Sequence, residues 1–352
     1  MMNWLRATCI IAVALTGCSP TTDGDDDGGG GETAEGGAMA GGGALGAGGQ
    51  MDLGGNSGAG GMDTSGFMDP DEGEPQPYVL PADLEEQVDG GEVEACPPQH
   101  AFINSARGWA VDRIGRPLDQ AMVQLCVKYQ DTAECLTPTS TNADGVFRLN
   151  TIEGKRCLSK MVFRSIMPGG LRAPAYVDYD VTLAANVNGD VVLREPFVLY
   201  ATTPIPNPPE VESDEDEYTF IYHTGMEIDL IPFDLNSDYL RLGIRVVDTS
   251  ERGLTFLEGH PAPDLLFAMS PDSSVYGDGA PIRIPNTLGL AAGAKVDLFF
   301  TAGVGCKDDG ELVDEGEWIN YGTGTVSADG AMIASDSDSG LTCVSWLGVS
   351  AQ

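Results

Sequence analysis

The chain has 352 residues, of which 54 are acidic and 18 are basic, and its formal net charge is -36. This balance excludes an electrostatic nucleic-acid binder and argues against a protein that recognises anionic lipid, because both need clustered Lys and Arg. The charge is unevenly spread: residues 19–100 contain 18 acidic residues and no Lys or Arg. The N-terminal part and the rest of the chain are therefore interpreted separately.

The first eighteen residues predict export. Arg6 is the only charged residue before an apolar run over residues 7–15. About nine apolar residues are too few to cross a bilayer, which takes roughly 20, so residues 1–17 are interpreted as a cleaved signal peptide.

The segment Leu15-Thr16-Gly17-Cys18 ends this signal. It resembles the lipobox of bacterial lipoproteins, and the resemblance implies lipid transfer to the Cys18 thiol, cleavage before Cys18 and palmitate on its new amino group. Two or three acyl chains hold a protein on a membrane without a spanning helix. Ser19 follows where inner-membrane lipoproteins carry Asp, which favours the outer membrane and leaves its periplasmic or surface face open. The alternative is an ordinary secretory signal with an incidental Cys18.

Residues 18–95 are predicted to form a disordered, acidic tether. Residues 19–70 contain 19 glycines and almost nothing that could form a core. Such a composition cannot offset a backbone ordering cost of roughly 1 to 2 kcal/mol per residue. Within the tether, the acidic residues after Pro81 favour one or two helical turns over residues 81–88.

Six cysteines follow the tether, and an even number in an exported chain without Cys-x2-Cys spacing predicts disulfides. Residues 121–128 alternate between apolar and other side chains, as in a half-buried strand. Placing Cys126 opposite Cys135 brings Leu125 opposite Leu136 on the core face, so this pairing is self-consistent. The favoured disulfides, with two other connectivities open for the first four cysteines, are Cys126–Cys135, Cys96–Cys157 and Cys306–Cys343.

Residues 96–203 are predicted to form the first of two antiparallel β-sandwich domains in an all-β protein. Short alternating runs are separated by turns such as Asn142-Ala143-Asp144-Gly145 and Asn188-Gly189. The runs Gly108-Trp109-Ala110-Val111-Asp112, Gly115-Arg116-Pro117-Leu118 and Asn142 to Leu149 resemble the carboxypeptidase regulatory-like domain, a transthyretin-like sandwich. The resemblance implies an accessory for folding or binding without catalytic residues. Gln120 and Cys157 depart from the family pattern, where Gly and an aromatic residue are usual.

Residues 204–217 are Pro-rich and acidic, which predicts a stiff linker to a second sandwich over residues 218–352. Two segments carry a second resemblance, Ile282 to Leu298 and Gly322 to Gly330, together with the closing Ser345-Trp346-Leu347-Gly348. They are similar to the zonula-occludens/netrin-receptor type of β-sandwich found in bacterial surface proteins.

Candidate chemistry in the folded part is sparse. The motifs of serine hydrolases, zinc proteases and nucleotide-binding enzymes do not occur in the part of the sequence that is predicted to fold. The densest acidic loop, with Asp308, Asp309, Glu311 and Asp314, is a weak calcium candidate, and a solvated loop is the favoured interpretation. Trp109, Trp318 and Trp346 are expected in the core and, as the alternative, on a sugar-stacking platform.

The predicted function is that of a non-catalytic, lipid-anchored envelope protein. It would bind an envelope protein or a glycan, with no nucleic-acid partner and no cofactor other than the calcium alternative. The competing hypothesis is an acidic surface hydrolase or an accessory subunit of one, because a glycosidase needs only two suitably placed carboxylates.

Overall fold

The structure is a computed structural model, and it describes residues 69–352 except 87, 89–92, 130–131, 170, 180, 182–185, 211, 213–215, 232–241, 276–278, 304 and 309. Cys18, the signal segment and the glycine-rich stretch lie outside the described residues. The helix α1 (Ala82–Glu85) confirms a single turn of the helix predicted near residue 81. The described part contains no helix with the length and apolarity needed to span a membrane.

Almost all regular structure is β, which confirms the predicted fold class. The strands of the first sandwich are β1 (Ala101–Phe102), β2 (Ser105–Asp112), β3 (Met122–Tyr129), β4 (Thr132–Cys135), β5 (Thr139–Ser140), β6 (Val146–Asn150), β7 (Cys157–Leu158), β8 (Lys160–Ile166), β9 (Ala175–Tyr179), β10 (Asn186–Val187), β11 (Asp190–Val192) and β12 (Phe197–Leu199).

The first sandwich packs two five-stranded sheets over one core. One sheet has the order β4-β3-β8-β9 with β5 beside β3, and the other has the order β10-β11-β2-β12 with β6 beside β2. The second sheet corrects the expectation of purely antiparallel pairing, because β11 and β12 both run parallel to β2. All eight residues of β2 are buried, as is usual for a strand with parallel neighbours.

The register of β3 follows the alternation in its sequence. Cys126 lies opposite Cys135, and the backbone N–H of Leu136 donates to the carbonyl of Leu125 at 2.8 Å. At the following hairpin, Gly145 has a φ of 75°, and a β-carbon there would collide with the carbonyl oxygen of Ala110. Glycine is therefore required at this turn. The disulfides are Cys96–Cys157, Cys126–Cys135 and Cys306–Cys343, the pairing that the sequence favours.

The second sandwich is built from a ten-stranded sheet and a small hairpin. Its elements are β13 (Thr203–Pro204), β14 (Tyr218–Ile221), β15 (Glu227–Leu230), β16 (Gly243–Val247), the 3-10 turn η2 (Thr255–Leu257), β17 (Leu265–Ser274), β18 (Ile282–Pro285), β19 (Lys295–Thr301), β20 (Lys307–Asp308), β21 (Glu311–Leu312), β22 (Trp318–Val326), β23 (Met332–Ser335) and β24 (Cys343–Ala351).

The ten-stranded sheet curls around a single core. Its order is β13-β16-β17-β24-β19-β22-β23-β18-β15-β14, and β20 pairs with β21 in the separate hairpin. Phe220 of β14 and Ile244 of β16 come from near opposite ends of this order, yet both are fully buried in one cluster with Phe300 and Leu347. One curled sheet therefore encloses its own core.

The end of the predicted tether belongs to the folded unit. Asp71 is fully buried, Leu84 is 1 % exposed, and the Tyr78 ring meets Trp109 edge-on with centroids 6.0 Å apart. The predicted tether boundary at residue 95 is therefore wrong for residues 69–86. The sequence does not indicate that this segment is folded, because a few charged and aromatic side chains hold it in place and it contains no apolar run.

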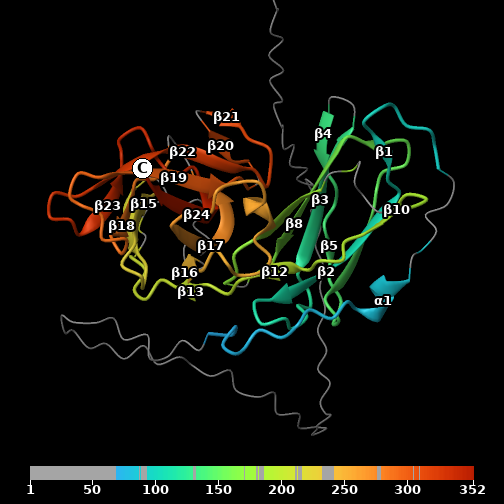
Figure 1. The fold of residues 1–352 in the computed structure, drawn as a ribbon, viewed down its shortest axis with the longest axis horizontal. Helices are drawn as coiled ribbons and strands as arrows, with labels where there is room; N and C mark the ends of the chain where they lie inside the picture. The colour runs from blue at the N-terminus through green and yellow to red at the C-terminus, as the bar shows by residue number, and fades with distance from the viewer. Residues whose placement is uncertain are drawn as a thin grey trace, which may run out of the picture. The chain divides into compact units, whose positions relative to one another are not determined.

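The predicted linker does not separate two independent domains. Pro204 pairs with Gly243 of β16, and Ile205 is buried in the second core. A further core is shared by both sandwiches, and Trp346 of β24 donates its indole N–H to the carbonyl of Pro174 at 2.7 Å. Figure 1 shows the green strands of the first sandwich and the yellow-to-red strands of the second as two groups, and the shared core joins them into one compact unit.

Candidate functional site

The acidic loop predicted as a weak calcium candidate forms the β20–β21 hairpin and the turn after it. Asp308 lies opposite Glu311, and Asp314 lies 3.3 Å from the ammonium of Lys160. Asp309 lies outside the described residues. Within the described part of the chain, Asp308, Glu311 and Asp314 do not come together as a group of metal ligands.

The three tryptophans of the folded part are core residues, as the sequence predicts. Trp109, Trp318 and Trp346 are 3 %, 8 % and 1 % exposed. Phe256 packs against the last two, with ring centroids 5.5 and 4.9 Å away. These three indoles therefore present no face to a sugar.

A cavity of about 430 Å³ lies where the two sandwiches meet. Strands β3, β4 and β8 of the first sandwich supply one wall, including Cys126, Cys135 and Lys160. The other wall is the segment 312–315, which begins at the last residue of β21 and includes Val313 and Glu315. The cavity combines apolar surface, a disulfide and charges of both signs, a mixture typical of ligand sites.

Lys160 connects the two walls electrostatically. Its ammonium lies 3.4 Å from a carboxylate oxygen of Asp178, 3.3 Å from one of Asp314 and 3.8 Å from one of Glu317. Partial burial disfavours the charged form, but Asp178 and Asp314 outweigh it and hold the pKa of Lys160 above its usual value. Lys160 is therefore charged at neutral pH and ties the first sandwich to the 312–317 segment.

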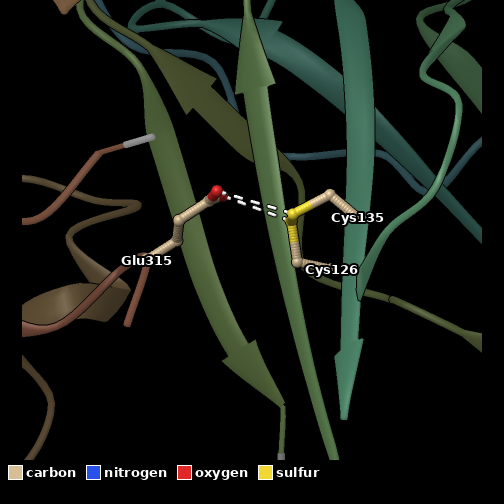
Figure 2. Close-up of side chains that lie close together, drawn as sticks. All are labelled: Cys126, Cys135 and Glu315. Carbon is tan, nitrogen blue, oxygen red and sulfur yellow. Dashed lines mark hydrogen bonds between the residues drawn. A yellow bond between two sulfur atoms is a disulfide. The ribbon is translucent and has the colours of Figure 1, made fainter. Parts of the chain in front are cut away.

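Glu315 points from the second sandwich onto the disulfide of the first. Figure 2 shows its carboxyl group beside both sulfurs, with one oxygen 3.3 Å from Sγ of Cys126 and the other 3.6 Å from Sγ of Cys135. Disulfide sulfurs carry no proton, so a hydrogen bond here requires a protonated carboxyl as the donor. Burial raises the pKa of Glu315, which favours that protonated form; Arg164 opposes this shift and Asp272 adds to it.

These three residues form the one cluster of three metal-ligand groups among the described residues. Metal binding by cysteine requires thiolates, and the disulfide leaves neither sulfur in that form. In the oxidised structure the cluster therefore consists of a disulfide with a neighbouring acid, and it is not a metal site.

A buried ion pair joins the two sandwiches near the cavity. Nε of Arg164 on β8 lies 2.5 Å from a carboxylate oxygen of Asp272 on β17, and the two side chains are 13 % and 3 % exposed. Burial raises the pKa of Asp272, and Arg164 opposes this shift. A β-carbon at Gly303 would collide with Asp272, so glycine is needed where this loop passes the pair. Breaking such a pair on one side would leave an uncompensated buried charge.

Sequence reasoning did not single out Lys160, Arg164 or Asp272. Two of them left a readable signal: Lys160 and Arg164 stand at alternate positions around Val162, on one face of a mostly apolar strand. Alternate side chains of a strand lie on one face, so these two charges mark a face of β8 that is not packed as purely apolar core. Which surface supplies the carboxylates depends on how the two sandwiches dock.

Comparisons with known proteins do not assign this chain to a family. Neither a protein-family model nor a curated protein matches it. A solved structure of a 9R-lipoxygenase from Cyanothece PCC8801 is similar over 35 % of this chain at 14 % identity, with a TM-score of 0.20. The match spans 20 % of the lipoxygenase, and a likeness at that score supports no statement about fold or activity.

Proposed function

We propose that the protein is a lipid-anchored envelope protein whose two-sandwich unit binds a protein partner. The observation that carries the proposal is that six cysteines form three disulfides. In the same chain, Cys18 stands at the end of a lipobox-like segment. Disulfides of this kind form in oxidising compartments outside the cytosol. The cysteine pattern and the N-terminal segment thus support the same exported location.

A protein partner is favoured over a glycan by the position of the aromatic side chains. The three tryptophans that could stack on a sugar are buried. The chain from residue 101 onward carries 36 acidic and 17 basic residues, so complementarity favours a partner with a basic surface. The proposed role is binding, without hydrolysis of the partner.

The proposed location is the outer membrane. Ser19 in place of Asp supports this location, and so does a glycine-rich stretch of 52 residues that would hold the folded unit off the lipid. A flexible chain of that length spans about 40 Å. Such a reach would hold the unit clear of the lipid on whichever face of the outer membrane carries the anchor.

The anchor is tested by Cys18→Ala in the full chain expressed in a bacterial host. We expect the unmodified chain to sediment with membranes and to carry acyl mass on Cys18, and the variant to lose both. The matched control is Cys9→Ala, which alters a cysteine of the segment that cleavage would remove. A free Cys18 thiol in the mature chain would reject the anchor.

Binding is tested by cross-linking the full mature chain in envelope preparations at increasing salt. We expect a basic protein partner whose cross-linked yield falls at high salt, since exposed charges are screened within about 10 Å at 0.1 M ionic strength. A yield that does not depend on salt, or hydrolysis of peptide or glycan by the purified chain, would contradict the proposal.

A further inference from the structure

We propose that Cys126–Cys135 is a redox-active disulfide that exchanges with a dithiol, and that Glu315 supplies the proton to the departing sulfur. This activity goes beyond partner binding and does not depend on the lipid anchor. It rests on three features of the cavity: an accessible disulfide, a backbone that holds both cysteines after reduction, and a carboxyl group beside both sulfurs.

Accessibility together with a neighbouring carboxyl group distinguishes this disulfide from the other two. Cys135 is exposed, Cys126 is half-buried, and both line the open cavity at the junction. Cys306 and Cys343 are completely buried, so a thiol cannot reach them in the folded protein. Cys96 and Cys157 are partly exposed, but among the described residues they belong to no cluster with a carboxylate. Thiol exchange needs access to a sulfur, and only two of the three pairs offer it.

The backbone around Cys126 and Cys135 does not need the disulfide to keep its geometry. The two residues are directly opposite in the β3–β4 pair, and β3 is also paired with β8 over seven residue pairs. The disulfide spans 9 residues, against 61 and 37 for the other two. A short loop restricts the unfolded chain least, so the fold depends least on this bond. The thiols would stay opposite each other and could be reoxidised.

The exposed sulfur of Cys135 is the point of attack. A thiolate of the dithiol attacks Sγ of Cys135, and the bond to Sγ of Cys126 breaks. Cys126 leaves with the bonding electron pair and takes the proton of the Glu315 carboxyl 3.3 Å away. The product is a mixed disulfide on Cys135, a Cys126 thiol and a Glu315 carboxylate. Protonation of the leaving sulfur assists this step, since a poorly stabilised thiolate leaves slowly.

The second step releases Cys135. The other thiol of the dithiol gives its proton to the Glu315 carboxylate through solvent and attacks its own partner sulfur in the mixed disulfide. Cys135 leaves and takes that proton from Glu315, 3.6 Å away. Overall, the protein disulfide is reduced to two thiols and the dithiol is oxidised to a disulfide. The second thiol of the dithiol supplies one proton, and the Glu315 carboxyl supplies the other and regains it from solvent, where the attacking thiolate had released its own.

The surroundings of Glu315 keep it suited to this role. Burial raises the pKa of its carboxyl group, so it holds a proton to a higher pH than an exposed glutamate. The charged groups that act on it or share its cavity are Arg164 and Lys160 of β8, Lys128 of β3, Glu134 of β4, Asp272 of β17 and Asp314. Lys128 and Lys160 offset part of the negative charge that Glu134 and Asp314 present to an incoming thiolate.

The test follows reduction of the full mature chain by dithiothreitol, with alkylation and mass mapping of each cysteine over time. We expect Cys126 and Cys135 to be labelled before Cys96 and Cys157, which serve as a control within the same molecule. Glu315→Gln should slow this reduction about tenfold at a pH low enough for Glu315 to be protonated in the unmodified chain, because an amide keeps the size of the side chain but transfers no proton. The matched variant Glu311→Gln changes an exposed acid of the same loop, and its rate should stay within about twofold of the unmodified chain.

Two single-cysteine variants test the direction of attack and do not depend on Glu315. Cys126→Ser should form a mixed disulfide at Cys135 with an oxidised dithiol, whereas Cys135→Ser should leave the half-buried Cys126 largely unmodified. Equal reduction rates for Glu315→Gln and the unmodified chain, with tryptophan fluorescence showing both folded, would overturn the proposal. Labelling of Cys96 and Cys157 as fast as Cys126 and Cys135 would overturn it as well.

Discussion

Replacing Asp71 by alanine should loosen the segment that joins the N-terminal stretch to the folded unit. The Asp71 carboxylate is fully buried, and one of its oxygens lies 2.9 Å from Nη1 of Arg172. Its other oxygen accepts the backbone N–H of Ala201 at 2.7 Å. Two residues earlier, Asp69 lies 2.5 Å from Nη2 of Arg245. Alanine would remove the central acceptor of this network and leave two arginines facing a void.

The magnitude follows from what remains paired. Removing one partner of a buried ion pair costs about 3–5 kcal/mol. Arg172 keeps a hydrogen bond to the carbonyl of Leu199 at 2.6 Å, and Arg245 keeps Asp69, so the lower end of that range applies. We expect Asp71→Ala to lower the free energy of unfolding by about 3 kcal/mol. For a folded unit of this size, the melting temperature would fall by roughly 5 °C.

The assay is a urea titration at pH 7 followed by tryptophan fluorescence, combined with limited proteolysis of residues 69–86. Trp109 reports on the segment because the Tyr78 ring packs edge-on against it. The control is Glu72→Ala, an exposed acid in the same segment, which should change the free energy of unfolding by less than about 0.5 kcal/mol. If Asp71→Ala and Glu72→Ala are equally stable and equally resistant to protease, the Asp71 network does not hold this segment.

Three further predictions concern stability. Asp336 accepts hydrogen bonds from Lys295 and two threonines, which lowers its pKa to about 2, below the value of 3.8 expected in the unfolded chain. The stabilisation that Asp336 provides is therefore present above about pH 4 and lost as the pH falls through about 2. After allowance for solvent screening, Asp336→Asn should lower the free energy of unfolding by about 1 kcal/mol at pH 6 and by nearly nothing at pH 2. Urea titrations across that range check this, and a cost independent of pH would contradict it. Gly348→Ala would place a β-carbon 2.5 Å from the Trp318 ring, so overpacking should cost about 1–3 kcal/mol, seen as a lower urea midpoint; an unchanged midpoint would show that the ring moves freely. Trp346→Phe should cost about 2–4 kcal/mol, because it leaves the carbonyl of Pro174 unpaired and opens a cavity in the shared core. Calorimetry measures this cost, and a melting temperature equal to that of the unmodified chain would exclude a tight junction at Trp346.

Short-range features of the fold could be read from the residues alone. The period-two alternation of residues 121–128 specifies which side chains of β3 face the core, and a one-residue slip would reverse every one of them. The same constraint favours a register with Cys126 opposite Cys135, which the structure has. Turns such as the one at Gly145 are equally local, since they need only a residue that tolerates positive φ. The all-β class, the burial of the tryptophans and the favoured disulfide pairing follow from such patterns.

The junction could not be read in this way, because its parts are far apart in the chain and individually unremarkable. Glu315 is one of several acids in a loop, and its contact with Cys126 joins residues separated by 189 positions. Asp272 and Arg164 look like ordinary charges on separate strands until the two sandwiches dock. Parallel pairing on β2 and the packing of Asp71 likewise depend on distant partners. Periodicity reports which face of a strand is buried, whereas the identity of the surface that buries it is set by long-range docking, and the contacts of the candidate site are made there.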